Sequence, residues 1–243
     1  MGYEIISGGG GSGGGPSVPL DGGHSADGDT IGLYALDGTT AGLTDSAGAL
    51  IDITADRALW VPSPYPDKAA PLSTTNAGVF VGVYTSSINP AASLPLTFAF
   101  LAMATSAKEL DPARDILRHE RSSFGFPSFR FSINDAGKLW LGRNTNIGWE
   151  AYGTEVVMPV DQWVHCALVF HANNDVTIYM NGTANKVSLD FVGGYDFTDG
   201  SSRLFLGSAG NGPSGVAIHS LIIKNIEATD SQVDAMVAEC PLP

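Results

Sequence analysis

The sequence is poor in basic residues and has no long apolar run. Of its 243 residues, 12 are Lys or Arg and 25 are Asp or Glu, so the formal net charge is −13. Proteins bind nucleic acids and anionic membranes through clustered Lys and Arg side chains, and the chain has no basic run. No apolar stretch approaches the roughly 20 residues that a membrane-spanning helix needs. We therefore expect neither nucleic-acid binding nor membrane insertion.

Cysteines and secretion features are also scarce. The first ten residues, MGYEIISGGG, have neither the basic nor the apolar segment of a secretion signal, which favours folding in a cytoplasm. The two cysteines are Cys166, within an apolar run, and Cys240, near the C-terminus. We favour two free thiols over a disulfide, and the sequence leaves both arrangements open.

The chain does contain enough apolar material for one large core. Hydrophobic residues make up 44% of the chain and charged residues 15%, which excludes global disorder. The 30 glycines and 14 prolines favour many turns and few long helices. A length of 243 residues suits one all-β sandwich better than two ordinary domains.

The N-terminal residues differ from the rest of the chain. A short strand-like piece, Tyr3–Ile6, precedes the run GGGGSGGGPS at residues 8–17. Such a run does not offset the entropy lost on ordering, which predicts a flexible tether. Its composition fits natural and engineered linkers alike, and we favour a natural one because non-linker sequence precedes it. We predict an arm at residues 1–28, suited to docking on a neighbouring subunit, and one domain at residues 29–243.

Short strands separated by turn residues follow the arm. In Pro127–Ile133 apolar and polar residues alternate, as in a strand with one buried face. Val164–Phe170 is apolar on both parities, as in a central strand buried on both faces. The predicted strands are Thr30–Leu36, Ala49–Thr54, Val79–Tyr84, Leu96–Ala104, Pro127–Ile133, Lys138–Leu141, Val164–Phe170, Val176–Met180, Arg203–Leu206 and Val216–Ile223.

Turn and capping residues complete the predicted fold. Tight turns are expected at 134–137, at 173–174 and at 181–182 because these positions hold Asn and Gly. Thr229 and Gln232 have the spacing of a capping box ahead of one C-terminal helix. The predicted fold class is all-β: an antiparallel two-sheet jelly-roll sandwich with a short C-terminal helix and a flexible Gly-rich N-terminal arm.

Several motifs in the last 80 residues occur in a characteristic order. They are WVHCALV at 163–169, VTIYMNG at 176–182 and LFLG at 204–207, followed by the strand to Ile223 and the capped helix. This order resembles the concanavalin A-like lectin/glucanase superfamily, in particular laminin-G-like jelly rolls. The resemblance is good from about residue 127 to 239 and extends back to about residue 29. The superfamily includes lectins, glycanases, adhesion modules and virion appendage domains, so the fold alone does not select a function.

The sequence offers little for catalysis. Glycanases of this superfamily use closely spaced carboxylates on one strand, and no glutamate here lies in such a pattern. Glu150 and Glu155 are five residues apart and would point to opposite faces of a strand, so we interpret them as solvated loop carboxylates. Gly23–Ala26 begins like a nucleophile elbow, but Asp27 stands where the second glycine should be, which favours a loop. We therefore expect no enzyme activity.

Metal sites are also weakly indicated. Residues 27–29 begin like a calcium loop, but Ile31 and Gly38 occupy ligand positions and exclude an EF-hand. The resemblance leaves room for a surface calcium ion, for which Asp190, Asp196 and Asp199 are the nearest cluster; no other cofactor is expected. His165 and His171 share a parity but lie about 20 Å apart by strand rise, so they cannot share a metal, and His165 fits a structural role better.

Exposed aromatic side chains would be needed to stack on a sugar ring. Trp149 and Tyr152, in a Gly/Asn-rich stretch, are the best candidates, followed by Trp60 and Tyr65 beside prolines. Each of these residues could equally well pack at a sheet edge.

Taken together, these features favour a non-enzymatic structural or binding protein. Our leading hypothesis is a phage virion surface component, either a capsid decoration or a tail appendage, that displays a lectin-like sandwich. It would be made in the host cytoplasm and located in the virion. Its expected partners are other virion proteins, further copies of itself in a homo-oligomer, and a cell-surface glycan. The alternative is a carbohydrate-binding lectin-like module, and a glycanase ranks third.

Overall fold

The structure is a computed structural model. It describes residues 23–37, 54–55, 59–72, 81–84, 94–105, 113–120, 127–134, 136–145, 148–189, 203–206 and 215–242, with the backbone alone at some strand positions.

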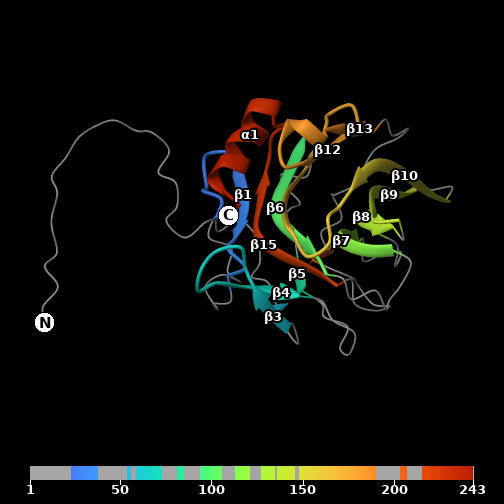
Figure 1. The fold of residues 1–243 in the computed structure, drawn as a ribbon. Helices are drawn as coiled ribbons and strands as arrows, with labels where there is room; N and C mark the ends of the chain where they lie inside the picture. Colours follow the sequence, from blue (N-terminus) through green and yellow to red (C-terminus); the bar gives the residue numbers. More distant parts are fainter. Residues whose placement is uncertain are drawn as a thin grey trace, which may run out of the picture.

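Two antiparallel sheets pack face to face as a jelly-roll sandwich (Figure 1). The eight-stranded sheet has the order β13 (Val187–Leu189), β12 (Val176–Met180), β11 (Trp163–Phe170), β6 (Leu96–Ala104), β15 (Val216–Lys224), β4 (Ala69–Leu72) and β3 (Leu59–Pro62), and β1 (Thr30–Tyr34) also pairs with β15. The seven-stranded sheet has the order β10 (Gly148–Val157), β9 (Lys138–Thr145), β8 (Pro127–Asn134), β7 (Ala113–Glu120), β14 (Arg203–Leu206), β5 (Val81–Tyr84) and β2 (Thr54–Ala55). A 3-10 turn, η2 (Thr183–Asn185), follows β12, and one helix, α1 (Asp230–Glu239), follows β15.

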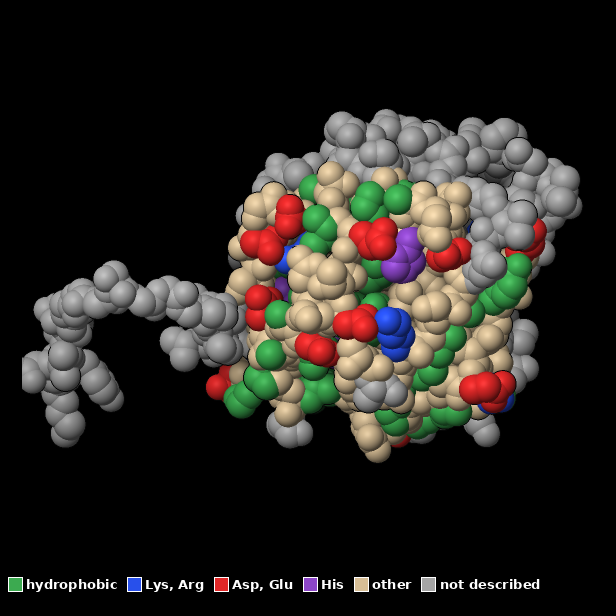
Figure 2. Space-filling view, turned by 90° about the horizontal axis from the view of Figure 1, so that it is seen from above, with side chains coloured by type: hydrophobic (Ala, Val, Ile, Leu, Met, Phe, Trp, Pro, Cys, Tyr) green, Lys and Arg blue, Asp and Glu red, His purple; other side chains and the backbone are tan. Residues whose placement is uncertain are grey.

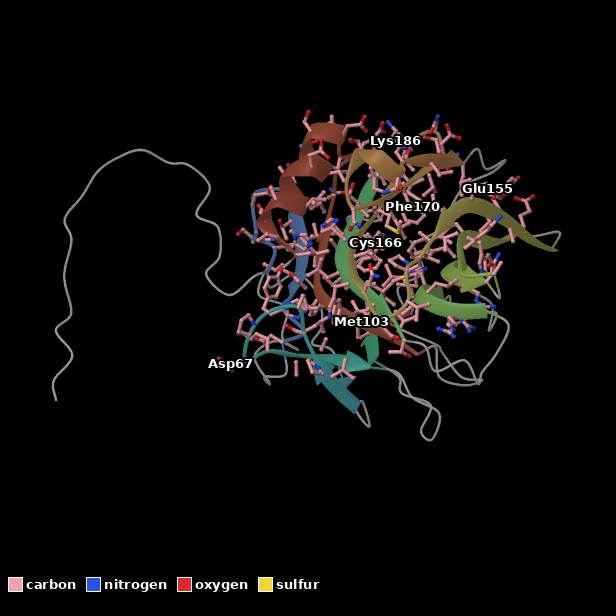
Figure 3. The ribbon with its side chains drawn as sticks, viewed as in Figure 1. Asp67, Met103, Glu155, Cys166, Phe170 and Lys186 are labelled. Carbon is pink, nitrogen blue, oxygen red and sulfur yellow. The ribbon has the colours of Figure 1, made fainter. Side chains whose placement is uncertain are left out.

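The main core fills the space between the two sheets. Phe98 of the eight-stranded sheet meets Phe129 of the other at a ring-centroid distance of 5.9 Å, edge to face. Phe170 packs on the same two rings, and both it and Cys166 lie between the sheets (Figure 3). Edge-to-face contacts of this kind add about 0.5–1.5 kcal/mol to the burial of each ring pair. Apolar and polar side chains alternate along β8, and the apolar face packs into the core, as the sequence predicted.

The outer face of the eight-stranded sheet is also covered. Val233 and Met236 of α1 pack on Ala167, Val169 and other small or apolar residues of this face in a second buried cluster. The sheet is therefore buried on both sides, which confirms the interpretation of β11. Seen from the end of the sandwich that carries α1 and β13, the surface shows more acidic than basic side chains (Figure 2), in keeping with the net charge of −13.

Most predicted elements are confirmed. Strands β6, β12 and β14 have the predicted bounds, and the turns hold residues of positive φ at Gly137, Asn174 and Asn181. The predicted strand Ala49–Thr54 lies outside the described residues except for its last position. Both cysteines are free and buried, as expected. Contacts with the sandwich begin before residue 29, because His24 is already buried, and the domain boundary there stays a prediction.

Strands β3, β4, β7, β10 and β13 were not predicted. The sequence of β7, ARDILRHE, carries charged residues that hide its alternation, and β10 begins in a stretch that reads as a loop. The interpretation of Glu150 and Glu155 as loop carboxylates is therefore wrong, since both lie on β10. Their predicted opposite orientation is consistent with the structure: Glu150 is paired with the buried Arg143, whereas Glu155 is exposed at the rim (Figure 3).

The capping box at the start of α1 provides a test of the fold. The Thr229 hydroxyl accepts a hydrogen bond from the backbone N–H of Gln232, and the Gln232 side chain accepts one from the backbone N–H of Thr229. We expect Thr229→Ala to lower the free energy of unfolding by about 1 kcal/mol in urea titrations. Ser231→Ala, at an exposed position in the first turn, is the control. Equal stabilities of the Thr229→Ala variant and the wild type would contradict the prediction.

Candidate functional site

A buried carboxylate organises the outer face of the seven-stranded sheet. The Asp115 side chain is fully buried, although it lies on the face directed away from the core. The Arg130 guanidinium donates to both of its oxygens, at 2.9 and 3.1 Å from Nε and 2.7 Å from Nη2. The Ser132 hydroxyl donates to the same carboxylate at 2.6 Å, and Arg118 Nη1 lies 3.9 Å away. Because Asp115 pairs with Ser132 across β7 and β8, strand register brings these groups together.

Trp140 lies beside this ion pair on the same face. It pairs with Ser132 of β8 on one side and with Gly153 of β10 on the other. The guanidinium carbon of Arg130 lies 5.7 Å from the centroid of the Trp140 ring, within the range of a cation–π contact. Trp140 is half-buried, so part of its surface reaches solvent.

The residues of β10 next to Trp140 are small. Ala151 and Gly153 are exposed, and a Cβ added at Gly153 would meet no atom within 4 Å. No bulky side chain therefore rises from these two positions of β10. We call Asp115, Arg130, Ser132, Trp140, Ala151 and Gly153 together the Trp140 shelf.

The Trp140 shelf combines an apolar surface with fixed polar groups. An indole ring offers a flat face for the C–H groups of a sugar, and a guanidinium held by a carboxylate offers directed donors for hydroxyl groups. Arg130 is held at several atoms, so little entropy would be lost on ligand binding. The sequence contained a signal for this residue: in KLWLG at 138–142, Trp140 has the opposite parity to Leu139 and Leu141, so it faces away from the core.

The two predicted sugar-binding aromatics occupy different positions on β10. Tyr152 pairs with Leu141 and packs against the core, half-buried. The backbone of Trp149 pairs with Asn144, and its side chain lies outside the described part. The backbone of Trp60 lies in β3, while Tyr65 packs on His219 at a centroid distance of 5.3 Å, where burial raises the pKa of its hydroxyl. The roles of Trp149 and Tyr152 in binding stay predictions.

The predicted calcium ligands Asp190, Asp196 and Asp199 lie outside the described residues. Within the described part, no group of three or more His, Cys, Asp or Glu side chains is placed to hold a metal ion. In the segment that begins like a calcium loop, the Asp27 carboxylate has partners within the protein: it accepts a hydrogen bond from Thr30 and pairs with Lys224. Residues 23–26 have no regular structure, as predicted for a loop.

The glutamates of the described part lie next to basic side chains. Each glutamate whose side chain is described has such a partner: Glu150 with Arg143, Glu155 with Lys138, Glu227 with His171 and Glu239 with His24. Asp115 is held by Arg130 and Ser132. The hydrogen bond from His171 lowers the pKa of Glu227, whereas a glycosidase acid needs a carboxyl group whose pKa is raised.

Residues 80–233 match a family model described as the concanavalin A-like lectin/glucanases superfamily. A comparison with curated protein sequences gives no significant match. Among the helices of the described part, none is both long and apolar enough to cross a membrane.

Solved structures with the same fold are binding domains and parts of glycan-active enzymes. The binding domain of Paraclostridial Mosquitocidal Protein 1 matches 86% of this chain with a TM-score of 0.67 and 17% identity, over 52% of its own length. Domain 4 of AbnA, a GH43 extracellular arabinanase from Geobacillus stearothermophilus solved with arabinotriose, matches 86% with a TM-score of 0.63 and 18% identity, over 98% of its length. The binding domain of botulinum neurotoxin DC in complex with SialylT matches 88% with a TM-score of 0.62 and 13% identity, over 52% of its length. This chain thus spans about half of the toxin domains, and at these identities the likeness shows the fold alone.

The buried Asp115 gives a testable prediction. Asp115→Ala would leave the Arg130 guanidinium and the Ser132 hydroxyl without their shared acceptor, so we expect a loss of roughly 2–3 kcal/mol in the free energy of unfolding. Glu155→Ala is the matched control, because this carboxylate is exposed and also pairs with a basic side chain, and it should leave stability unchanged. Equal effects of the two substitutions in urea titrations would show that Asp115 does not organise the face.

Proposed function

The chain belongs to the concanavalin A-like lectin/glucanases superfamily, and on this basis we propose that its sandwich is a carbohydrate-binding module that holds a glycan on the Trp140 shelf. The observation that carries the proposal is the placement of Trp140 between a fixed Arg130–Asp115 pair and the small residues of β10. An aromatic ring flanked by fixed polar groups is a common arrangement for sugar recognition.

Two of the similar structures support a saccharide ligand. One is an arabinanase domain in complex with arabinotriose, and another is a neurotoxin binding domain in complex with SialylT. In our proposal a sugar ring lies against Trp140 above Gly153. Arg130 donates to the sugar hydroxyls, and Asp115 keeps the guanidinium in place. A cell-surface glycan is the partner that this arrangement would suit.

We propose that the module binds without catalysing. In support, Glu150 and Glu155 each form an ion pair with a basic side chain, and they lie on opposite faces of β10. A surface calcium ion at Asp190, Asp196 and Asp199 remains part of the proposal. Binding should therefore be measured both with added calcium and with a chelator.

Substitutions on the Trp140 shelf test the proposal. A glycan array identifies a ligand, and calorimetric titration then measures its affinity. We expect Trp140→Ala to remove the stacking surface and Gly153→Leu to block it, each raising Kd at least tenfold, which corresponds to about 1.4 kcal/mol. Trp149→Ala tests separately whether the ligand binds at the aromatic pair predicted from the sequence, Trp149 and Tyr152, instead of at the shelf.

Val160→Ser is the control for these variants, because Val160 is 51% exposed and lies outside β10 and the shelf. Its affinity should equal that of the wild type. No ligand on the array, with or without calcium, would refute the carbohydrate-binding module. A ligand whose affinity is insensitive to Trp140→Ala and Gly153→Leu would refute the site.

A virion surface component is the second candidate function. The observation that favours it is the Gly/Ser-rich run at residues 8–17, behind the apolar piece Tyr3–Ile6 and ahead of the sandwich. In this proposal the domain is located on a virion, and the N-terminal piece docks on another virion protein or on a second copy of the chain. The lectin-like sandwich would then face the cell surface.

The docking role of the arm makes this second candidate testable. If the arm of one copy docks on another, the full chain should be a homo-oligomer, and Ile5→Asp combined with Ile6→Asp should convert it to a monomer in size-exclusion chromatography with light scattering. Ser7→Ala is the control and should keep the oligomer. A monomeric wild type whose first residues are degraded freely, and which binds no particle, would refute the virion proposal.

A further inference from the structure

A second buried polar cluster lies on the outer face of the eight-stranded sheet, on the opposite side of the sandwich from the Trp140 shelf. It joins the first described residues to strand β15 and to the end of α1. The backbone N–H of His24 donates to Ser220 Oγ at 2.8 Å, and that of Ser25 donates to Glu239 Oε2 at 3.1 Å. Two side chains separated from this segment by about 200 positions in sequence therefore hold residues 23–25 in place.

The His24 side chain anchors the segment. It is fully buried, with Nδ1 at 3.5 Å from Cys240 Sγ and 3.7 Å from Glu239 Oε2. Burial raises the pKa of the Cys240 thiol to about 12, so the thiol keeps its proton and can donate it to Nδ1. A thiol donor requires an unprotonated Nδ1, so this contact fits neutral His24. Burial also lowers the pKa of His24, and Glu239 opposes this effect.

His165 of β11 lies directly beneath His24. The two rings meet edge to face at a centroid distance of 5.2 Å. His165 is fully buried, and neither of its ring nitrogens has a hydrogen-bond partner among the described residues. Burial lowers the pKa of His165 well below its ordinary value, and the adjacent His24 adds to the shift. A charge on His165 would be buried without a paired carboxylate, which is strongly unfavourable.

The titratable groups around His24 and His165 would do little to stabilise a positive charge on either ring. Glu239 of α1 approaches His24, whereas Lys224 of β15 opposes a charge there and is itself paired with Asp27 of the first segment. The remaining neighbouring titratable groups are Cys240, His219 of β15, which contacts the carbonyl oxygen of Leu36, and Tyr65, which packs on His219. None of these last groups carries a negative charge at neutral pH.

We propose that His24 and His165 form an acid-sensitive latch that holds residues 23–25 on the sandwich at neutral pH and releases them at mildly acidic pH. When the latch is closed, both rings are neutral. When it opens, both reach solvent and take up a proton below their ordinary pKa of about 6.5. Acidification therefore favours the open form, by up to about 30-fold per histidine at pH 5. His165 contributes most, because Glu239 partly offsets a charge on His24. The latch is independent of glycan binding.

Hydrogen exchange of the full chain between pH 7.5 and pH 5 tests the latch, after correction for intrinsic exchange rates. We expect the backbone N–H groups of His24 and Ser25 to lose protection at least tenfold, while those of β11 stay protected. Unchanged protection at residues 24–25 would overturn the proposal. Parallel loss at residues 24–25 and in β11 would also overturn it, because it would indicate global unfolding.

Two histidine substitutions, one within β11 and one directly after it, give a matched comparison. His165→Gln removes the titrating ring and should abolish most of the pH dependence at residues 24–25. His171→Gln should keep the wild-type dependence, because His171 follows β11, is partly exposed and already pairs with Glu227. If His165→Gln does not fold, His24→Gln replaces it and should reduce the dependence. A wild-type pH response in the folded variant would refute the latch.

Discussion

The structure depends on the burial of one sheet from both sides. Strands β6, β11 and β15 carry apolar residues at successive positions, and each face of these strands needs its own cover. The seven-stranded sheet covers the inner face, while α1 and the segment around His24 cover the outer one. Leaving either face in water would expose apolar side chains whose burial stabilises the fold. The seven-stranded sheet has no such requirement on its outer side, and there a tryptophan and an ion pair take the place of a helix.

This difference explains which parts of the fold could be predicted from the sequence. The bounds of β6, β12 and β14 were predicted to the residue because turn-forming or polar residues flank each of these mostly apolar runs. The capped helix was predicted because Thr229 and Gln232 act locally. Strand β7 was missed because Asp115 lies on its outer face yet is fully buried by Arg130 and Ser132 from the next strand, a partnership that no local pattern reveals.

The candidate site was harder to predict for the same reason. Aromatic residues near glycine and asparagine drew attention to Trp149 and Tyr152, but Tyr152 packs against the core. Trp140 sits within an apolar run, and only the pairing of β9 with β8 and β10 shows what lies beside it. The contacts of His24 with Ser220, Glu239 and Cys240 span most of the chain and could not be derived from spacing. Sequence patterns predicted which side chains of a strand face the core, whereas the residues that contact those side chains could be identified only from the structure.

The contact between His24 and Cys240 also has an architectural meaning. It places both ends of the described sandwich next to each other, on the side opposite the Trp140 shelf. A module built this way can be spliced into a surface loop of another protein, or joined head to tail in a circular permutant, with only a short connection. In either setting the shelf would point away from its host. The contact between His24 and Cys240 thus gives the sandwich one side suited to attachment, where both ends lie, and an opposite side that carries the shelf.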